Sequence, residues 1–209
     1  MKKRGLFITF EGIEGSGKST QIELLGKYFS NKGYDVVLTR EPGGTKIGDE
    51  IRKILLSPEN KEMNEMVEAL LYAASRVQLV SEIIEPALKS RKVILCDRYY
   101  DSSLAYQAYG RGIAFSVIEG INKPAVERAI PDITFFLDIS VEEGLRRATV
   151  PFADRIESES LKFHNRVREG FLELARKNPE RFVVIDGTRK TGEIFEEIIQ
   201  KMEEFLLLK

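Results

Sequence analysis

The sequence is poor in the residues that build covalent or metal-based scaffolds. Its 209 residues include one cysteine, one histidine and no tryptophan. A single cysteine excludes a disulfide framework and a cysteine-ligated zinc site, and it fits a reducing compartment. Glycine and proline, at 16 and 7 residues, are too few for a disordered or fibrous chain. What remains is an ordinary globular composition.

Long hydrophobic runs and an excess of positive charge are also missing. The apolar runs are far shorter than the roughly 18 residues that span a bilayer, and Leu6–Phe10 is too short for the apolar region of a signal peptide. The formal net charge is −1, which gives no basic surface for duplex nucleic acid. We therefore expect a cytoplasmic chain that forms one domain over residues 1–209, without a membrane or nucleic-acid partner.

The apolar pattern predicts an α/β fold. Short apolar runs that read as buried strands alternate with segments of helical spacing, such as Ile22, Leu25 and Phe29. Strands separated by helices imply parallel pairing, so we expect a five-stranded parallel sheet within three α/β/α layers, and ligands beyond the carboxyl ends of the strands. The five expected strands are Leu6–Phe10, Val36–Leu38, Val93–Cys96, Ile133–Leu137 and Phe182–Ile185.

The first strand is followed by a glycine-rich loop with the full P-loop spacing, Gly12-Ile13-Glu14-Gly15-Ser16-Gly17-Lys18-Ser19-Thr20. Glycines let backbone amides wrap an anion at a helix N-terminus, and the lysine reaches the β and γ phosphates. The motif predicts a P-loop NTPase-type fold that binds ATP. The ATP-binding residues expected here are Gly12, Glu14, Gly15, Ser16, Gly17, Lys18, Ser19 and Thr20.

A second carboxylate element follows the third strand. Val93–Cys96 ends on Asp97, which has the form of a Walker B element. Because Mg²⁺ prefers oxygen ligands and accompanies bound ATP, we expect Ser19 and Asp97 to be the protein residues at the metal.

Arginines at the strand ends indicate an acceptor that carries a phosphate. Arg40 follows the second strand and Arg98 follows Asp97, and the planar guanidinium matches phosphate oxygens. The sequence lacks the glycine that GTPase switches place three residues after the Asp, and Asn122-Lys123-Pro124-Ala125 lacks the final Asp of a guanine-reading motif. Two arginines at adjacent strand ends could bind a second phosphate group opposite the ATP site.

Together with the P-loop, the segments Thr39–Thr45 and Asp97–Tyr99 resemble the thymidylate kinase family. The resemblance runs from Leu6 to the C-terminal helix and includes Ala74–Arg76, Ala105–Gln107 and Asp154–Glu157. It implies phosphorylation of dTMP to dTDP by Mg-ATP, through in-line attack of the dTMP phosphate on the γ-phosphorus, and it implies a homodimer.

The resemblance also implies roles for individual residues. Arg40 and Arg98 would bind the dTMP phosphate, Tyr72 would stack on thymine where the family more often has Phe, and Arg76 would bond a thymine carbonyl. Ser103 and Gln107 match positions that face the base. The full expected dTMP set is Glu14, Arg40, Pro42, Tyr72, Arg76, Arg98, Ser103, Tyr106 and Gln107.

On the donor side, the resemblance places Arg147 and Gly187 at the adenine, and a lid at about residues 148–158. The lid lacks the family's usual arginines between Arg147 and Arg155. Transition-state charge would then fall to Arg155, Arg147 or Arg146, together with Lys18 and Mg²⁺, and of these arginines we favour Arg155. The catalytic set is then Lys18, Asp97, Arg98 and Arg155.

Two other functions remain open at this point. A deoxynucleoside kinase would need a carboxylate base at the acceptor, and a nucleotide-binding regulatory protein would have no activity. His164, the one histidine, lacks a partner His or Cys in the sequence and is interpreted as a packing or surface residue.

Overall fold

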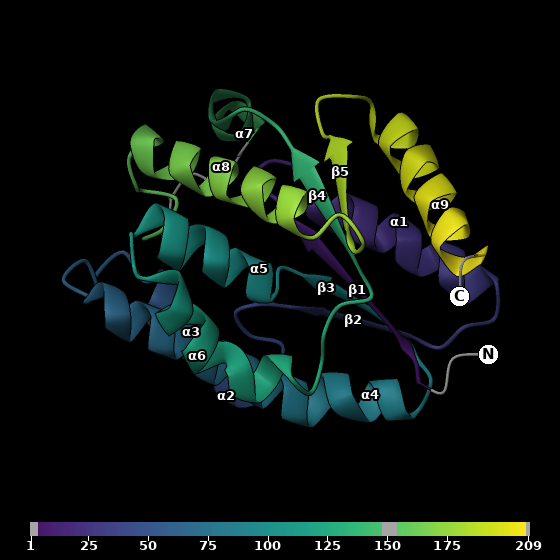
Figure 1. Cartoon of the computed structure of the whole chain (residues 1–209), viewed down its shortest axis with the longest axis horizontal. Coiled ribbons are helices and arrows are strands. Elements are labelled where there is room, and N and C mark those ends of the chain that lie inside the picture. Colours follow the sequence, from purple (N-terminus) through teal and green to yellow (C-terminus); the bar gives the residue numbers. More distant parts are fainter. Residues whose placement is uncertain (1–3, 148–153, 208–209) are drawn as a thin grey trace.

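A computed structural model describes residues 4–147 and 154–207 of the chain. Its centre is a five-stranded sheet in the order β2-β3-β1-β4-β5, in which every neighbouring pair is parallel (Figure 1). The predicted five-stranded parallel sheet is therefore confirmed. The strands are β1 (Leu6–Glu11), β2 (Val36–Arg40), β3 (Val93–Asp97), β4 (Ile133–Asp138) and β5 (Phe182–Asp186).

Helices cover both faces of the sheet (Figure 1). The helices are α1 (Lys18–Asn31), α2 (Lys46–Leu56), α3 (Glu65–Leu79), α4 (Glu85–Lys89), α5 (Tyr100–Ser103), α6 (Phe115–Val126), α7 (Val141–Arg147), α8 (Leu161–Lys177) and α9 (Thr191–Leu207). Two π-helical segments, η1 (Val80–Ile84) and η2 (Leu104–Gly110), continue α3 and α5. In the described part of the chain, no helix is both long and apolar enough to cross a membrane.

Apolar side chains of alternating orientation build a core on each side of the sheet. Ile8 and Phe10 of β1 pack with residues of α1 and α9, whereas Phe7 packs with the η1, α4 and β3 cluster on the opposite side. The central strands are buried on both faces, which explains their continuous hydrophobic runs.

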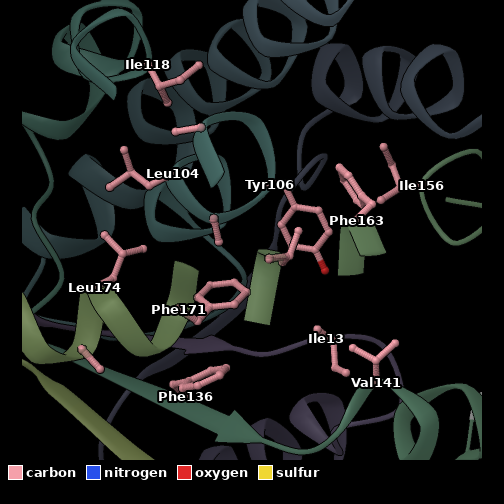
Figure 2. Packing of buried hydrophobic residues seen from close by; sticks show 14 of the residues in the cluster. Ile13, Leu104, Tyr106, Ile118, Phe136, Val141, Ile156, Phe163, Phe171 and Leu174 are labelled. Atoms are coloured by element: carbon pink, nitrogen blue, oxygen red, sulfur yellow. The ribbon is translucent and has the colours of Figure 1, made fainter. Parts of the chain in front are cut away.

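The third cluster joins the core to the carboxyl edge of the sheet. Tyr106 of η2 lies beside Phe163 and Phe171 of α8, with ring centroids 6.1 and 6.2 Å apart, and Phe171 stacks on Phe136 of β4 (Figure 2). Aromatic packing of this kind holds η2 against α8 and fixes the wall from which Tyr106 and Gln107 project. The wall lines the cavity described next.

Candidate active site

The carboxyl ends of β1 and β3 border a cavity of about 320 Å³. The predicted acceptor residues that line it are Glu14, Pro42, Tyr72, Arg76, Arg98, Ser103, Tyr106 and Gln107. The structure thus brings together eight side chains from the P-loop, the β2–α2 loop, α3 and the segment after β3. Ligands bind at this edge in parallel α/β sheets.

The P-loop has the backbone geometry that its glycines permit. Gly15 and Gly17 have φ of +74° and +92°, a conformation that side chains disfavour. Lys18 is buried and its Nζ donates to the carbonyls of Gly12 and Ile13 at 3.1 and 3.0 Å. Burial, together with the charge of Arg98, lowers the pKa of Lys18 to about 8. The Lys18 ammonium therefore lies within the P-loop, where it can meet an anionic ligand.

The two residues expected at the metal lie side by side. Ser19 Oγ donates to Asp97 Oδ2 at 3.0 Å, although 78 positions separate them in the chain. A hydroxyl and a carboxylate at the P-loop helix are oxygen donors of the kind that Mg²⁺ accepts alongside nucleotide phosphates. These residues fit the expected ion.

Arg98 connects the P-loop with the cavity. It has φ of +65°, unusual for a residue with a side chain, and its amide donates to the Phe10 carbonyl at 2.9 Å. Its Nη1 donates to the Gly12 carbonyl at 2.7 Å, and the guanidinium lies 5.3 Å from the centre of the Tyr106 ring. The same guanidinium thus touches the donor loop and lines the acceptor cavity.

Glu11, at the end of β1, binds the segment that follows Arg98. Its two carboxyl oxygens accept from the Tyr99 amide at 2.8 Å and the Ser102 hydroxyl at 2.6 Å. Complete burial, with Asp101 nearby, raises the pKa of Glu11 to about 8. Sequence reasoning missed this residue, because it reads as the last position of a buried strand.

Arg76 is fully buried and saturated with hydrogen bonds. Its five N–H groups donate to Glu41 through Nε (2.8 Å) and Nη2, to Ser103 Oγ (2.9 Å), to Asn122 Oδ1 and to the Tyr99 carbonyl (3.1 Å). A thymine carbonyl can therefore bond Arg76 only if one of these acceptors gives way. Ser103 accepts from Arg76, so its own hydroxyl hydrogen remains free for a ligand.

Arg155 does not line the cavity. Its Nη1 pairs with Glu68 at 2.7 Å, and its Nε donates to the Leu55 carbonyl at 2.9 Å. The predicted catalytic role thus requires Arg155 to leave Glu68, and it stays a prediction. The lid residues 148–153 lie outside the described part of the chain.

Arg40 also differs from the expected arrangement. Its side chain is 56% exposed and pairs with Asp49 at 3.4 Å, and it is not among the cavity-lining residues. Arg52 of α2 lines the cavity instead and donates to the Pro42 carbonyl at 3.0 Å. Arg52 and Arg98 thus line the cavity and Arg40 does not, and the role of Arg40 at the dTMP phosphate stays a prediction.

Other lining residues were also missed from the sequence. Glu41 lines the cavity with Oε1 buried and unpartnered among the described residues, and burial raises its pKa to about 7. His164 also lines it, and its Nε2 lacks a hydrogen-bond partner within residues 4–147 and 154–207. The interpretation of His164 as mere packing is therefore too narrow, though only the fold could place it here.

The two residues expected at the adenine, Arg147 and Gly187, lie next to each other. Arg147 Nη1 donates to the Gly187 carbonyl at 2.8 Å, and Arg147 Nε pairs with Glu143 at 2.5 Å. α7 lies directly on the P-loop, because a Cβ on Gly144 would stand 2.6 Å from the Glu14 carbonyl oxygen. Arg147 and the loop after β5 thus form one side of the P-loop.

Comparisons with known proteins agree with this geometry. A family model described as Thymidylate kinase matches residues 10–198. The chain is 51% identical over 208 residues to the thymidylate kinase of Halothermothrix orenii, covering 98% of this chain and 99% of that one. It is 50% identical over 205 residues to that of Pelobacter propionicus, covering 95% and 94%. A crystal structure of thymidylate kinase from Ehrlichia chaffeensis superposes with a TM-score of 0.79 at 37% identity, covering 95% of this chain and 98% of that chain.

Proposed function

The chain belongs to the thymidylate kinase family, and from this premise we propose how its residues transfer the γ-phosphoryl group of ATP to dTMP. The reaction is ATP + dTMP → ADP + dTDP. A kinase acting on deoxynucleosides and a silent regulatory protein, the two alternatives left open by the sequence, are not favoured by these relatives.

One observation carries the residue-level proposal, namely that Arg98 touches the Gly12 carbonyl and lines the acceptor cavity. ATP phosphates occupy the P-loop, and dTMP occupies the cavity with its phosphate toward Arg98 and Arg52. The acceptor phosphate and the γ-phosphate then approach from opposite sides of one guanidinium. Such positioning supplies much of the catalysis in phosphoryl transfer.

The chemical step needs no strong base. The second pKa of a phosphate monoester is about 6, so the dTMP phosphate is already an anionic nucleophile near pH 7. One of its oxygens forms a bond to the γ-phosphorus while the bond to the bridging oxygen of ADP breaks. Lys18 and Arg98 offset the charge on the transferring group, with Arg155 joining them once it has left Glu68.

Ser19 and Asp97 would hold Mg²⁺ on the donor phosphates. When bound there, the ion would neutralise part of the charge of the donor phosphates. The donor nucleotide base lies against Arg147 and the Gly187 loop, and Tyr72 stacks on thymine. The cation–π contact between Arg98 and Tyr106 holds these two side chains against each other in the cavity.

The test is ADP release with Mg-ATP and a panel of dTMP, dUMP, dCMP, dGMP, AMP and thymidine. We expect strong preference for dTMP, and dTMP turnover lost in Lys18→Met. Thymidine as the preferred acceptor would refute the phosphate-binding role of Arg52 and Arg98. ATP binding without turnover of any acceptor would refute the activity itself.

We also propose that the protein acts as a homodimer in the cytoplasm. Exposed apolar side chains on α2 and α3, including Ile54 and Leu70 at 48% exposure each, support a subunit contact, and the free buried Cys96 fits a reducing compartment. Sedimentation equilibrium at micromolar protein tests the dimer, and a monomer at all concentrations refutes it.

A further inference from the structure

Glu68 stands behind the cavity wall as a buried, fully bonded carboxylate. It is 1% exposed, and its two oxygens accept hydrogen bonds from Gln107 Nε2 (2.9 Å), Arg111 Nε (3.2 Å) and Arg111 Nη2 (3.0 Å). Its Oε2 also forms an ion pair with Arg155 Nη1 at 2.7 Å. Burial alone would raise its pKa, but the bonds with Arg111 and Gln107 and the charge of Arg155 outweigh burial and lower it. Glu68 is therefore ionised and can only accept hydrogen bonds.

An acceptor-only neighbour fixes which way an amide points. Gln107 must turn its NH₂ toward Glu68, because its oxygen would meet a carboxylate oxygen in the opposite orientation. No described group donates to Gln107 Oε1, and Gln107 lines the cavity. The polar atom left for a ligand is thus an acceptor.

The pyrimidine bases differ at the atom that such an acceptor reads. Thymine and uracil carry a hydrogen on N3, whereas cytosine has a lone pair there. An amide oxygen facing N3 bonds the first two and repels the third.

We propose that Glu68 is a specificity-determining positioning residue, which holds Gln107 Oε1 toward the acceptor base so that the cavity selects pyrimidines bearing hydrogen at N3. The inference rests on the proposal that Gln107 faces the base of dTMP. It assigns the base preference to a residue that does not line the cavity.

The test compares kcat/KM for dTMP and dCMP in wild type, Glu68→Gln, Gln107→Ala and the double variant. A glutamine at 68 can donate or accept, so the Gln107 amide is free to turn. We expect Glu68→Gln to lower the dTMP-to-dCMP ratio by about tenfold or more, in line with losses at sites built around one hydrogen bond. The substitution also breaks the ion pair between Glu68 and Arg155. Any resulting change in turnover affects both acceptors alike, so it cancels in the dTMP-to-dCMP ratio.

The double variant and a matched control isolate the amide. In a Gln107→Ala background, Glu68→Gln should leave the ratio unchanged, because no amide remains to be oriented. Arg111→Lys, which weakens an ion pair of Glu68 but keeps the Gln107 bond, should keep the wild-type ratio. An unchanged ratio in Glu68→Gln, the same shift in both backgrounds, or an equal shift in Arg111→Lys would each overturn the inference.

Two further measurements separate the possible failures. If Glu68→Gln does not fold, hydrogen exchange in ¹⁵N-labelled wild type is measured instead. The Gln107 side-chain amide, bound to Glu68, should exchange slowly with water, both with and without dTMP. Loss of this protection on dTMP binding would overturn the inference. If wild type turns over dTMP but Gln107→Ala leaves base preference unmoved, Gln107 does not face the base, and the inference fails while the kinase activity stands.

Discussion

Substituting Gly144 by alanine tests whether the position of α7 on the P-loop controls ATP binding. The new Cβ would lie 2.6 Å from the Glu14 carbonyl oxygen and 2.9 Å from Ile13 Cδ1, whereas ordinary contact begins at 3.4 Å. The first of these contacts is with backbone, so α7 has to retreat by about 0.8 Å, and overpacking of this kind costs about 1–3 kcal/mol. The retreat draws Arg147 away from the Gly187 carbonyl.

Because Arg147 is proposed to contact the donor nucleotide, we expect the KM for ATP to rise by about tenfold, which corresponds to about 1.4 kcal/mol, while the KM for dTMP changes little. The assay is initial-rate ADP release with ATP varied at saturating dTMP. Gly120→Ala in α6 is the matched control, since its Cβ would meet nothing within 4 Å. A folded Gly144→Ala protein with a wild-type KM for ATP would refute the reasoning.

Three further predictions address catalysis, pH and stability. Arg155→Ala should lower kcat by about 100-fold or more with little change in the KM for dTMP; a near-normal kcat contradicts the role of Arg155. Glu11 has a pKa raised to about 8, so the folded state retains a proton between about pH 4.5 and 8 that the unfolded chain releases. As pH rises through this range, the free energy of unfolding should fall by up to about 1.4 kcal/mol per pH unit. Glu11→Gln should remove this dependence in urea titrations, and equal pH dependence in wild type and variant would disprove the role of Glu11. Arg181 bonds buried Asp101 through both Nη atoms at 2.7 and 2.8 Å, so Arg181→Met should cost about 3–5 kcal/mol of stability by urea unfolding, and a loss below about 1 kcal/mol would count against it.

The sequence was most informative where chemistry follows directly from backbone order. The P-loop comes straight after β1, and Asp97 closes β3, its parallel neighbour, so their juxtaposition needs only the sheet topology. The bond between Ser19 and Asp97 is of this kind. Arg147 and Gly187 could be paired only through the family resemblance, because they lie 40 positions apart on different elements.

Other features depend on side-chain directions that spacing cannot give. Arg40 sits at the predicted strand end, yet Asp49 on α2 draws its guanidinium aside, and Arg52 from the next turn of that helix lines the cavity. Glu68 looks like any polar position on α3 until η2 and the segment after residue 153 cover it. The contacts of Glu68 arise only because α3, η2 and the segment after residue 153 meet in the folded chain.

The P-loop lysine has a consequence for how the donor arrives. Because Lys18 Nζ donates to two carbonyls of its own loop, each hydrogen bond that it makes to a phosphate oxygen replaces one that it makes to the loop. The backbone of the loop is set by its glycines, whereas the lysine exchanges carbonyl acceptors for phosphate acceptors. Selection among anions then follows from how many oxygens they offer at once, and a polyphosphate chain displaces the carbonyls more effectively than a single phosphate.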